Sequence, residues 1–212
     1  MDQIDDVRPL ASRTKTQTMT GIGLFVAIAL ILNLSRLQVP APYAPFLIYE
    51  IWEIPIVACL LIYGLGASII ASLINTGVLL LVNPGSLGAG PIYNLIAVIV
   101  TLISISAGNK LLSRMHAGSA PIVVATTALA AALRALVLTF VNFVLLPFPP
   151  PLGFSIPLTG VTGVIAILPL IAFFNATIVL YTVPFGYAVV RAVSSRFRFR
   201  LAYPLTSSSL SK

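Results

Sequence analysis

Six apolar segments, each with very few charged residues, account for most of this 212-residue chain. A membrane-spanning helix needs about 20 consecutive, mainly apolar residues, because lipid offers no hydrogen-bond partner to an exposed backbone. We therefore predict an all-α integral membrane protein, a six-transmembrane-helix bundle. The predicted helices cover residues 19–37, 52–64, 66–83, 91–113, 120–146 and 161–193.

The second and third predicted helices are short for a full crossing. They meet at the glycine-containing corner YGLGA, residues 63–67. Two arrangements fit this pattern: one kinked helical hairpin, or a tilted pair of separate spans.

Composition supports membrane insertion and narrows the function. Hydrophobic residues make up 58% of the chain and charged residues only 8%, and the mean hydropathy is +1.06, so a water-soluble domain is excluded. The single cysteine, Cys59, permits no internal disulfide and no multi-cysteine metal site. The polar start of the chain has no processing site of the A-x-A kind, so we expect no cleaved signal peptide.

The distribution of cations predicts the topology. With six spans and the N-terminus inside, ten of the twelve Lys and Arg residues fall on the cytoplasmic side. Both termini are therefore expected in the cytoplasm, with residues 1–18 as an N-terminal segment, 19–193 as the membrane domain and 194–212 as a basic tail. We expect a multi-pass protein of the plasma membrane, in contact with lipid. Because the cations cluster at the ends of apolar runs, nucleic acid is not an expected partner.

The predicted outer connections, 38–51, 84–90 and 147–160, are rich in proline and glycine. Proline fixes a backbone dihedral and reduces the entropy of a loop, so we expect ordered covers over a site on the outer side. An enzyme is not expected. The one histidine, His116, lies in a basic inner loop, and no His, Cys, Asp or Glu cluster has metal-ligand spacing.

Polar residues inside the apolar segments are the candidate ligand contacts. Lipid cannot satisfy them, so they should face the interior of the bundle. The candidates include four neutral amides, which suit a neutral, hydrogen-bonding organic ligand: Asn75, Asn94, Asn142 and Asn175. The alternative is that they only join neighbouring helices.

Two acids flank the tryptophan at the start of the second helix. Glu50 and Glu53 share one face if this stretch is helical, with Trp52 beside them. They are interpreted either as a hydrated interfacial pair with Trp52 as an anchor, or as ligand acceptors or partners of Arg36 or Arg134. Arg134 is the one cation deep in a span, and it is either functional or extended towards the cytoplasmic surface.

The first predicted helix has small residues at intervals of three and four, at Thr20, Gly23 and Ala27. Such a stripe allows another helix to approach closely, which makes it a candidate docking face for a partner subunit.

The order of these motifs resembles a known family. Residues 18–193 carry a proline-rich outer loop, E-x-x-x-x-P-I, GLGASIIASLIN, GPIYNLIA, RALVLTFVNFVLLPF and LPLIAFFNATIVLYTVPFGYAVV. This order and spacing is similar to that of the substrate-binding S components of energy-coupling factor (ECF) vitamin importers, most closely the riboflavin-specific branch.

The resemblance implies a six-helix bundle that binds its vitamin near the outer surface, under the loop between helices one and two. It implies no cofactor of its own, because ATP is used by two ATPase subunits that act with a transmembrane coupling subunit. Asn142 and Asn175 match positions of expected ligand contacts, and Tyr43 in the cover completes the expected substrate-binding set. Gly23 and Ala27 match the docking face in place of an Ala-x-x-x-Ala pair.

One departure concerns the ligand. The riboflavin branch commonly has a lysine where this chain has Ile178. Riboflavin therefore stands first among vitamin-like heterocycles, with a different small heterocycle as an option. Two other functions remain open from the residues: a self-sufficient secondary transporter, which usually shows inverted repeats and acids in mid-membrane, and a structural membrane subunit without a ligand.

Overall fold

The computed structural model describes residues 14–35, 37–82, 89–114, 118–149, 153, 160–196 and 201–203. Within this part of the chain, six helices and one two-stranded hairpin follow in the order α1 (Lys15–Leu34), β1 (Val39–Ala41), β2 (Ala44–Tyr49), α2 (Glu53–Tyr63), α3 (Leu65–Val82), α4 (Gly90–Arg114), α5 (Ser119–Leu145) and α6 (Gly160–Arg196). The six predicted helices are confirmed, with boundaries that differ by four residues at most. Most of the predicted tails and of the segments 84–90 and 147–160 lie outside the described residues, as does Arg36.

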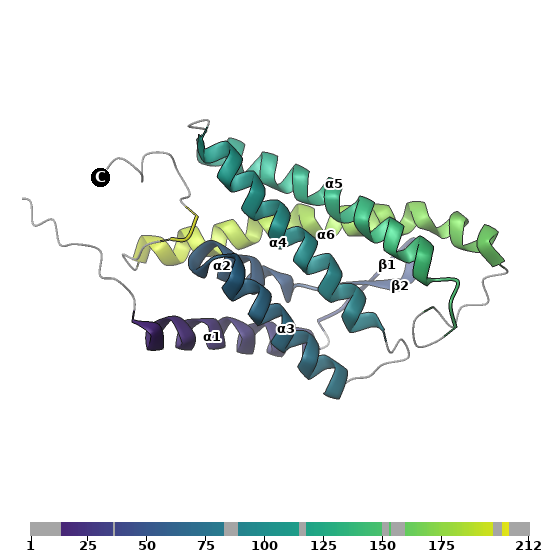
Figure 1. Cartoon of the computed structure of the whole chain (residues 1–212), viewed down its shortest axis with the longest axis horizontal. Coiled ribbons are helices and arrows are strands. Elements are labelled where there is room, and N and C mark those ends of the chain that lie inside the picture. Colours follow the sequence, from purple (N-terminus) through teal and green to yellow (C-terminus); the bar gives the residue numbers. More distant parts are fainter. Residues whose placement is uncertain are drawn as a thin grey trace, which may run out of the picture.

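The helices form an elongated bundle whose two ends differ (Figure 1). The start of α1, the end of α6, the end of α4 and the start of α5 lie at one end, which we call the terminal end. The opposite end, where α3 and α5 finish and α4 and α6 begin, is called the lid end. The first helix thus begins, and the last helix finishes, at the same end of the bundle.

Five helices are long and apolar enough to cross a membrane, and α2 is not among them. The 11 residues of α2 rise about 16 Å, roughly half of a hydrocarbon core of about 30 Å. The second helix is thus short for a full crossing, as its sequence indicated. The β1–β2 hairpin precedes it in the chain, and β2 lines the candidate site described below.

The corner between α2 and α3 depends on a glycine. Gly64 has φ of 92°, a conformation that side-chain-bearing residues rarely adopt, and its N–H donates to the Leu60 carbonyl. The chain reverses here, and α3 returns towards the lid end (Figure 1). Of the two arrangements left open by the sequence, the structure shows two helices separated by one residue.

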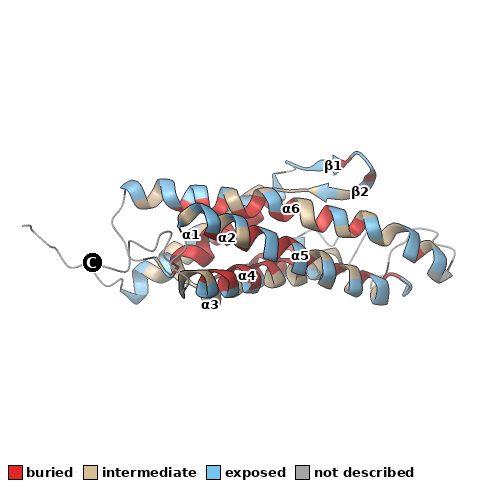
Figure 2. Cartoon of the chain, turned by 90° about the horizontal axis from the view of Figure 1, so that it is seen from above, coloured by how far each residue is buried: buried red, intermediate tan, exposed pale blue. Residues whose placement is uncertain are grey.

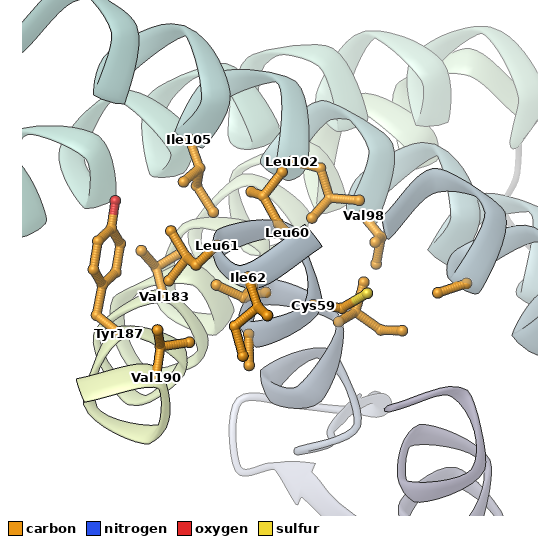
Figure 3. Close-up of a cluster of buried hydrophobic side chains, with 14 of the residues drawn as sticks. Cys59, Leu60, Leu61, Ile62, Val98, Leu102, Ile105, Val183, Tyr187 and Val190 are labelled. Carbon is orange, nitrogen blue, oxygen red and sulfur yellow. The ribbon is translucent and has the colours of Figure 1, made fainter. Parts of the chain in front are cut away.

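The main apolar core surrounds α2. Nine of its eleven residues are buried, and its neighbours come from α1, α3, α4, α5 and α6. Figure 3 shows Leu60, Leu61 and Cys59 among side chains of α4 and α6. Buried positions run along the inside of the bundle, whereas the outward faces are mostly exposed and apolar (Figure 2), as expected of a protein surrounded by lipid.

The segment between α1 and α2 contains the hairpin, which the sequence analysis did not predict. Strands β1 and β2 are antiparallel, with Val39 opposite Tyr49 and an irregularity between Pro40 and Ala41. Its ring contacts to α6 include Tyr43 with Phe173, and Tyr49 with Phe174 and Tyr181. The segment 38–51 therefore contains a strand pair seated on α6. The description of the fold as all-α needs this one addition.

The C-terminal residues 201–203 pack back onto the terminal end of the bundle. The backbone N–H groups of Ala202 and Tyr203 both donate to the carbonyl of Leu61, near the end of α2. Tyr203 is buried, and its hydroxyl shares a hydrogen bond with Ser106 of α4. Part of the predicted tail is therefore a structured element of the core.

A close approach of α2 and α6 gives a stability prediction. A Cβ added at Gly186 would lie 2.5 Å from Cγ1 of Val57. We expect Gly186→Val to lower the free energy of unfolding by about 1–3 kcal/mol, because the added side chain must displace the packed helices. Thermal unfolding in detergent measures this effect. The control is Gly77→Ala, since nothing lies within 4 Å of an added Cβ at Gly77. Equal unfolding midpoints for the two variants would contradict the predicted packing.

Candidate functional site

A cavity of about 210 Å³ lies between the hairpin and the lid-end halves of the helices. Its lining combines many apolar side chains with a few amides and charges, the usual composition of a small-molecule site. The described residues that line it are Phe46, Leu47, Ile48, Glu50, Trp52, Glu53, Ala89, Gly90, Tyr93, Asn94, Ala97, Arg134, Leu138, Asn142, Gly153, Ile167, Ile171, Phe174, Asn175 and Ile178. The cavity therefore has β2 and the β2–α2 connection on one side and α4, α5 and α6 on the others.

The inner end of the cavity carries a buried ion pair. Nη1 and Nη2 of Arg134 donate to Oε2 and Oε1 of Glu53 at 2.6 and 2.8 Å. Both side chains are almost inaccessible, at 2% and 6% exposure. Such a two-pronged geometry is the strong form of an Arg–carboxylate contact. The pair joins the first residue of α2 to the middle of α5, and so fixes the depth at which α2 begins.

The contact between Glu53 and Arg134 distinguishes between the interpretations that the sequence left open for these residues. Glu53 and Trp52 are buried, so the hydrated interfacial interpretation is wrong for these two residues. Arg134 does not extend to the cytoplasmic surface, because its guanidinium is held by Glu53. Glu50 precedes α2, and the two acids therefore do not share a helical face. The interpretation in which one carboxylate pairs with Arg134 is the one that the geometry supports.

Two asparagines are oriented by their own helices. Nδ2 of Asn142 donates to the Leu138 carbonyl at 2.7 Å, and Nδ2 of Asn175 donates to the Ile171 carbonyl at 2.9 Å. Oδ1 of Asn175 also accepts a hydrogen bond from Nε of Arg134. Because each amide nitrogen carries two hydrogens, each side chain keeps one further donor. Both residues line the cavity, so these groups are placed for a ligand.

Glu50 connects the hairpin to the cavity. Its carboxylate accepts hydrogen bonds from Nε2 of Gln38 at 2.7 Å and from Nε1 of Trp52 at 2.8 Å. The backbone carbonyl of Glu50 accepts from the hydroxyl of Tyr181 on α6. These contacts tie both ends of the hairpin segment to each other and to α6.

The environment of Glu50 predicts a dependence of stability on pH. Burial raises the pKa of Glu50 above its usual 4.5, hydrogen bonds from Trp52 and Gln38 act against this rise, and the charge of Glu53 adds to it. A carboxyl with a raised pKa in the folded state contributes stability below its unfolded pKa and loses it as pH rises through the folded pKa. As pH rises above about 4.5, the unfolding midpoint of the wild type should therefore fall relative to that of Glu50→Gln. Parallel pH profiles of the two proteins would show that Glu50 has no such effect.

The tip of the hairpin is held by a chain of hydroxyl groups. The Tyr43 and Tyr49 hydroxyls lie 2.6 Å apart, and that of Tyr49 lies 2.7 Å from Oγ1 of Thr177 on α6. Tyr43 itself does not line the cavity. Its observed contacts hold the hairpin on α6.

The structure brings six of the eight predicted substrate-binding residues to this cavity: Glu50, Trp52, Glu53, Asn94, Asn142 and Asn175. Tyr43 and Asn75 are not in the lining. Asn75 is fully buried on α3, and neither of its amide atoms has a hydrogen-bond partner among the described residues. Sequence reasoning missed the apolar part of the lining, because residues such as Ile171 and Phe174 look like any other apolar residue of a membrane helix.

The predicted docking face on α1 is open. Gly23 and Ala27 are both exposed, and no heavy atom lies within 4 Å of a Cβ added at Gly23. Along the same helix, Met19, Leu24 and Ile31 are more than half exposed. The surface is therefore flat and apolar, whether lipid or another helix covers it.

Comparisons with known proteins place the fold. No family model and no curated protein matches the sequence. Among solved structures, the chain is similar to one described as the S component of a bacterial ECF transporter. The TM-score is 0.67 at 18% sequence identity, and the match covers 87% of this chain and 99% of the other. At this identity the likeness establishes a shared fold: a multi-pass helical membrane bundle of the S-component type.

Proposed function

We propose that this chain is the substrate-binding subunit of an ATP-driven ECF importer and that its cavity captures a vitamin-like solute. The observation that carries this proposal is the cavity under the β1–β2 hairpin, lined by oriented amides, in a bundle with the S-component fold. In this role the chain binds and releases its ligand without changing it chemically.

The proposed orientation places the lid end outside and both termini in the cytoplasm of a cell whose plasma membrane the chain spans. Cytoplasmic connections of membrane proteins carry an excess of Lys and Arg. Lys15, Lys110 and Arg196 all lie near the terminal end of the bundle. The cavity would then open to the medium from which a nutrient is taken.

Energy for uptake would come from partner subunits. A transmembrane coupling subunit would contact the open face of α1 at Gly23 and Ala27, and two ATPase subunits would drive the cycle. The small side chains of this face permit the close helix approach that such docking needs. This stretch of α1 buries little of its surface within the chain, which supports its availability to a partner.

The proposed ligand is a neutral heterocycle of vitamin size, with riboflavin as the first candidate. Trp52 and Phe46 offer aromatic surface to a ring, and Asn94, Asn142 and Asn175 offer amide donors and acceptors. Ile178 lines the cavity at the position where the riboflavin branch commonly has lysine. Because Ile178 carries no charge, a ligand at this position would meet no cation. It would be held by the neutral amides instead.

Purification in mild detergent followed by absorption spectroscopy and mass spectrometry of extracted small molecules tests the proposal. We expect about one bound vitamin per chain, because a buried cavity of this kind retains a tightly bound ligand. A flavin spectrum would identify riboflavin, whereas another bound vitamin would keep the function and change the ligand. A preparation that is empty and binds no member of a vitamin panel would favour a structural subunit. Ligand uptake by vesicles that contain this chain alone would favour a secondary transporter.

A further inference from the structure

The charged side chains that line the cavity differ in how freely they can contact a ligand. Among the described residues that line the cavity there is one cation, Arg134, and there are two acids, Glu50 and Glu53. On α4, α5 and α6 the innermost lining residues are Ala97, Arg134 and Ile178, so the guanidinium lies at the inner end of the cavity. A ligand that enters under the hairpin would meet this end last.

Arg134 has little capacity left for an anionic ligand. Of its five N–H groups, four donate within the protein: two to Glu53, one to Asn175 and one, at 3.4 Å, to Thr101. An anion that approached the guanidinium would also approach the Glu53 carboxylate. Because charges interact strongly in a site of low dielectric, this repulsion would offset the attraction of Arg134.

From this pairing we infer that Glu53 is a specificity-determining residue: by occupying Arg134, it makes the cavity select an uncharged ligand over a phosphorylated or carboxylated analogue. This inference rests on the proposed function and adds the charge class of the substrate. In this inference Glu53 acts on selectivity by occupying Arg134, whereas Asn142 and Asn175 supply neutral contacts to the ligand. A cell that used such a carrier would import the free vitamin and attach any phosphate afterwards.

The test measures the dissociation constants of riboflavin and riboflavin 5′-phosphate for the purified full chain, by quenching of flavin fluorescence. In the wild type we expect riboflavin to bind on the order of tenfold more tightly, because the ester brings two negative charges near Glu50 and Glu53. Two single variants should shift this ratio in opposite directions. Glu53→Gln frees Arg134 and should lower the preference for riboflavin about tenfold, whereas Arg134→Gln leaves Glu53 unbalanced and should raise it.

Two further variants serve as matched controls. Glu53→Asp keeps the charge and should keep the wild-type preference. The double variant E53Q/R134Q removes both charges. If the freed Arg134 causes the change seen in Glu53→Gln, the preference of the double variant for riboflavin should return towards that of the wild type. Should Glu53→Gln fold too poorly for titration, the wild type, Arg134→Gln and the double variant still give the comparison.

Three outcomes separate this inference from the proposed function. Equal binding of both compounds by the wild type, or shifts of the two single variants in the same direction, would overturn the role of Glu53 and leave the carrier function intact. If the wild type retains a different vitamin, that vitamin and its phosphorylated or carboxylated form replace the flavin pair, with the same expected ratios. If the wild type binds neither flavin nor any other vitamin, the proposed function fails, and the inference fails with it.

Discussion

Replacing Arg134 by leucine should lower the free energy of unfolding by about 3–5 kcal/mol, because it leaves the Glu53 carboxylate buried without its partner. Both carboxylate oxygens lose a short hydrogen bond, and Asn175 loses the donor that holds its Oδ1. The start of α2 would then have to move or admit water. Thermal unfolding of purified protein in detergent, or a titration with denaturant, measures the change.

The matched control replaces both members of the pair. Glu53→Leu combined with Arg134→Leu removes the charges together, and buried ion pairs replaced by apolar residues of similar size are often neutral or stabilising. We therefore expect the double variant to recover most of the stability lost in Arg134→Leu, although the cavity would lose its polar inner end. A double variant no more stable than Arg134→Leu would show that the pair contributes through its geometry and that charge compensation is secondary.

The helices of this protein could be predicted because lipid imposes a simple condition on the sequence. Every backbone group inside the membrane must be paired, so long apolar runs become helices, and their limits follow from charge, proline and glycine. The corner at Gly64 was visible as YGLGA for the same reason. The short second helix was also visible in the sequence, as the segment 52–64, but apolar character alone did not show that the chain at 38–51 forms a strand pair.

The hairpin was not predicted, and physical reasons explain why. Two prolines, Pro40 and Pro42, lie in or beside β1, and proline is depleted in strands because it cannot donate to the ladder. The run FLIY in β2 does carry strand-favouring residues, and it could have signalled a strand. Its pairing, however, depends on α6, through contacts such as Tyr49 with Thr177, which are 128 residues apart.

The candidate site was predicted in its polar part only. Amide side chains stand out in apolar runs, so Asn142 and Asn175 could be named among the candidates from the sequence. The partner of Arg134 could not be identified from the sequence, because Glu53 lies 81 residues away and only the folded bundle brings the two together. Asn75 shows the limit of the approach: it has the same chemistry as the other amides, yet helix α3 does not line the cavity.

Asn142 and Asn175, two of the three asparagines that line the cavity, should dominate ligand affinity. Each presents a remaining amide donor to the cavity, and replacement by alanine would leave the matching ligand acceptor unpaired. A lost neutral hydrogen bond costs about 0.5–1.5 kcal/mol, and an unpaired buried group costs about 1–3 kcal/mol. We expect Asn142→Ala and Asn175→Ala each to weaken binding about tenfold and the double variant to weaken it about a hundredfold. Isothermal titration with the vitamin extracted from the wild-type protein measures the loss.

Asn75→Ala is the matched control, because it makes the same chemical change at a buried asparagine outside the cavity. Its affinity should equal that of the wild type. Its stability should be equal or higher, because neither amide atom of Asn75 has a hydrogen-bond partner among the described residues. If Asn75→Ala weakened binding as much as Asn142→Ala, the amides would act by joining helices, since a residue that touches no ligand could then affect affinity only through the packing of the bundle. A loss confined to Asn142 and Asn175 would instead locate the ligand between α5 and α6, beside the ion pair.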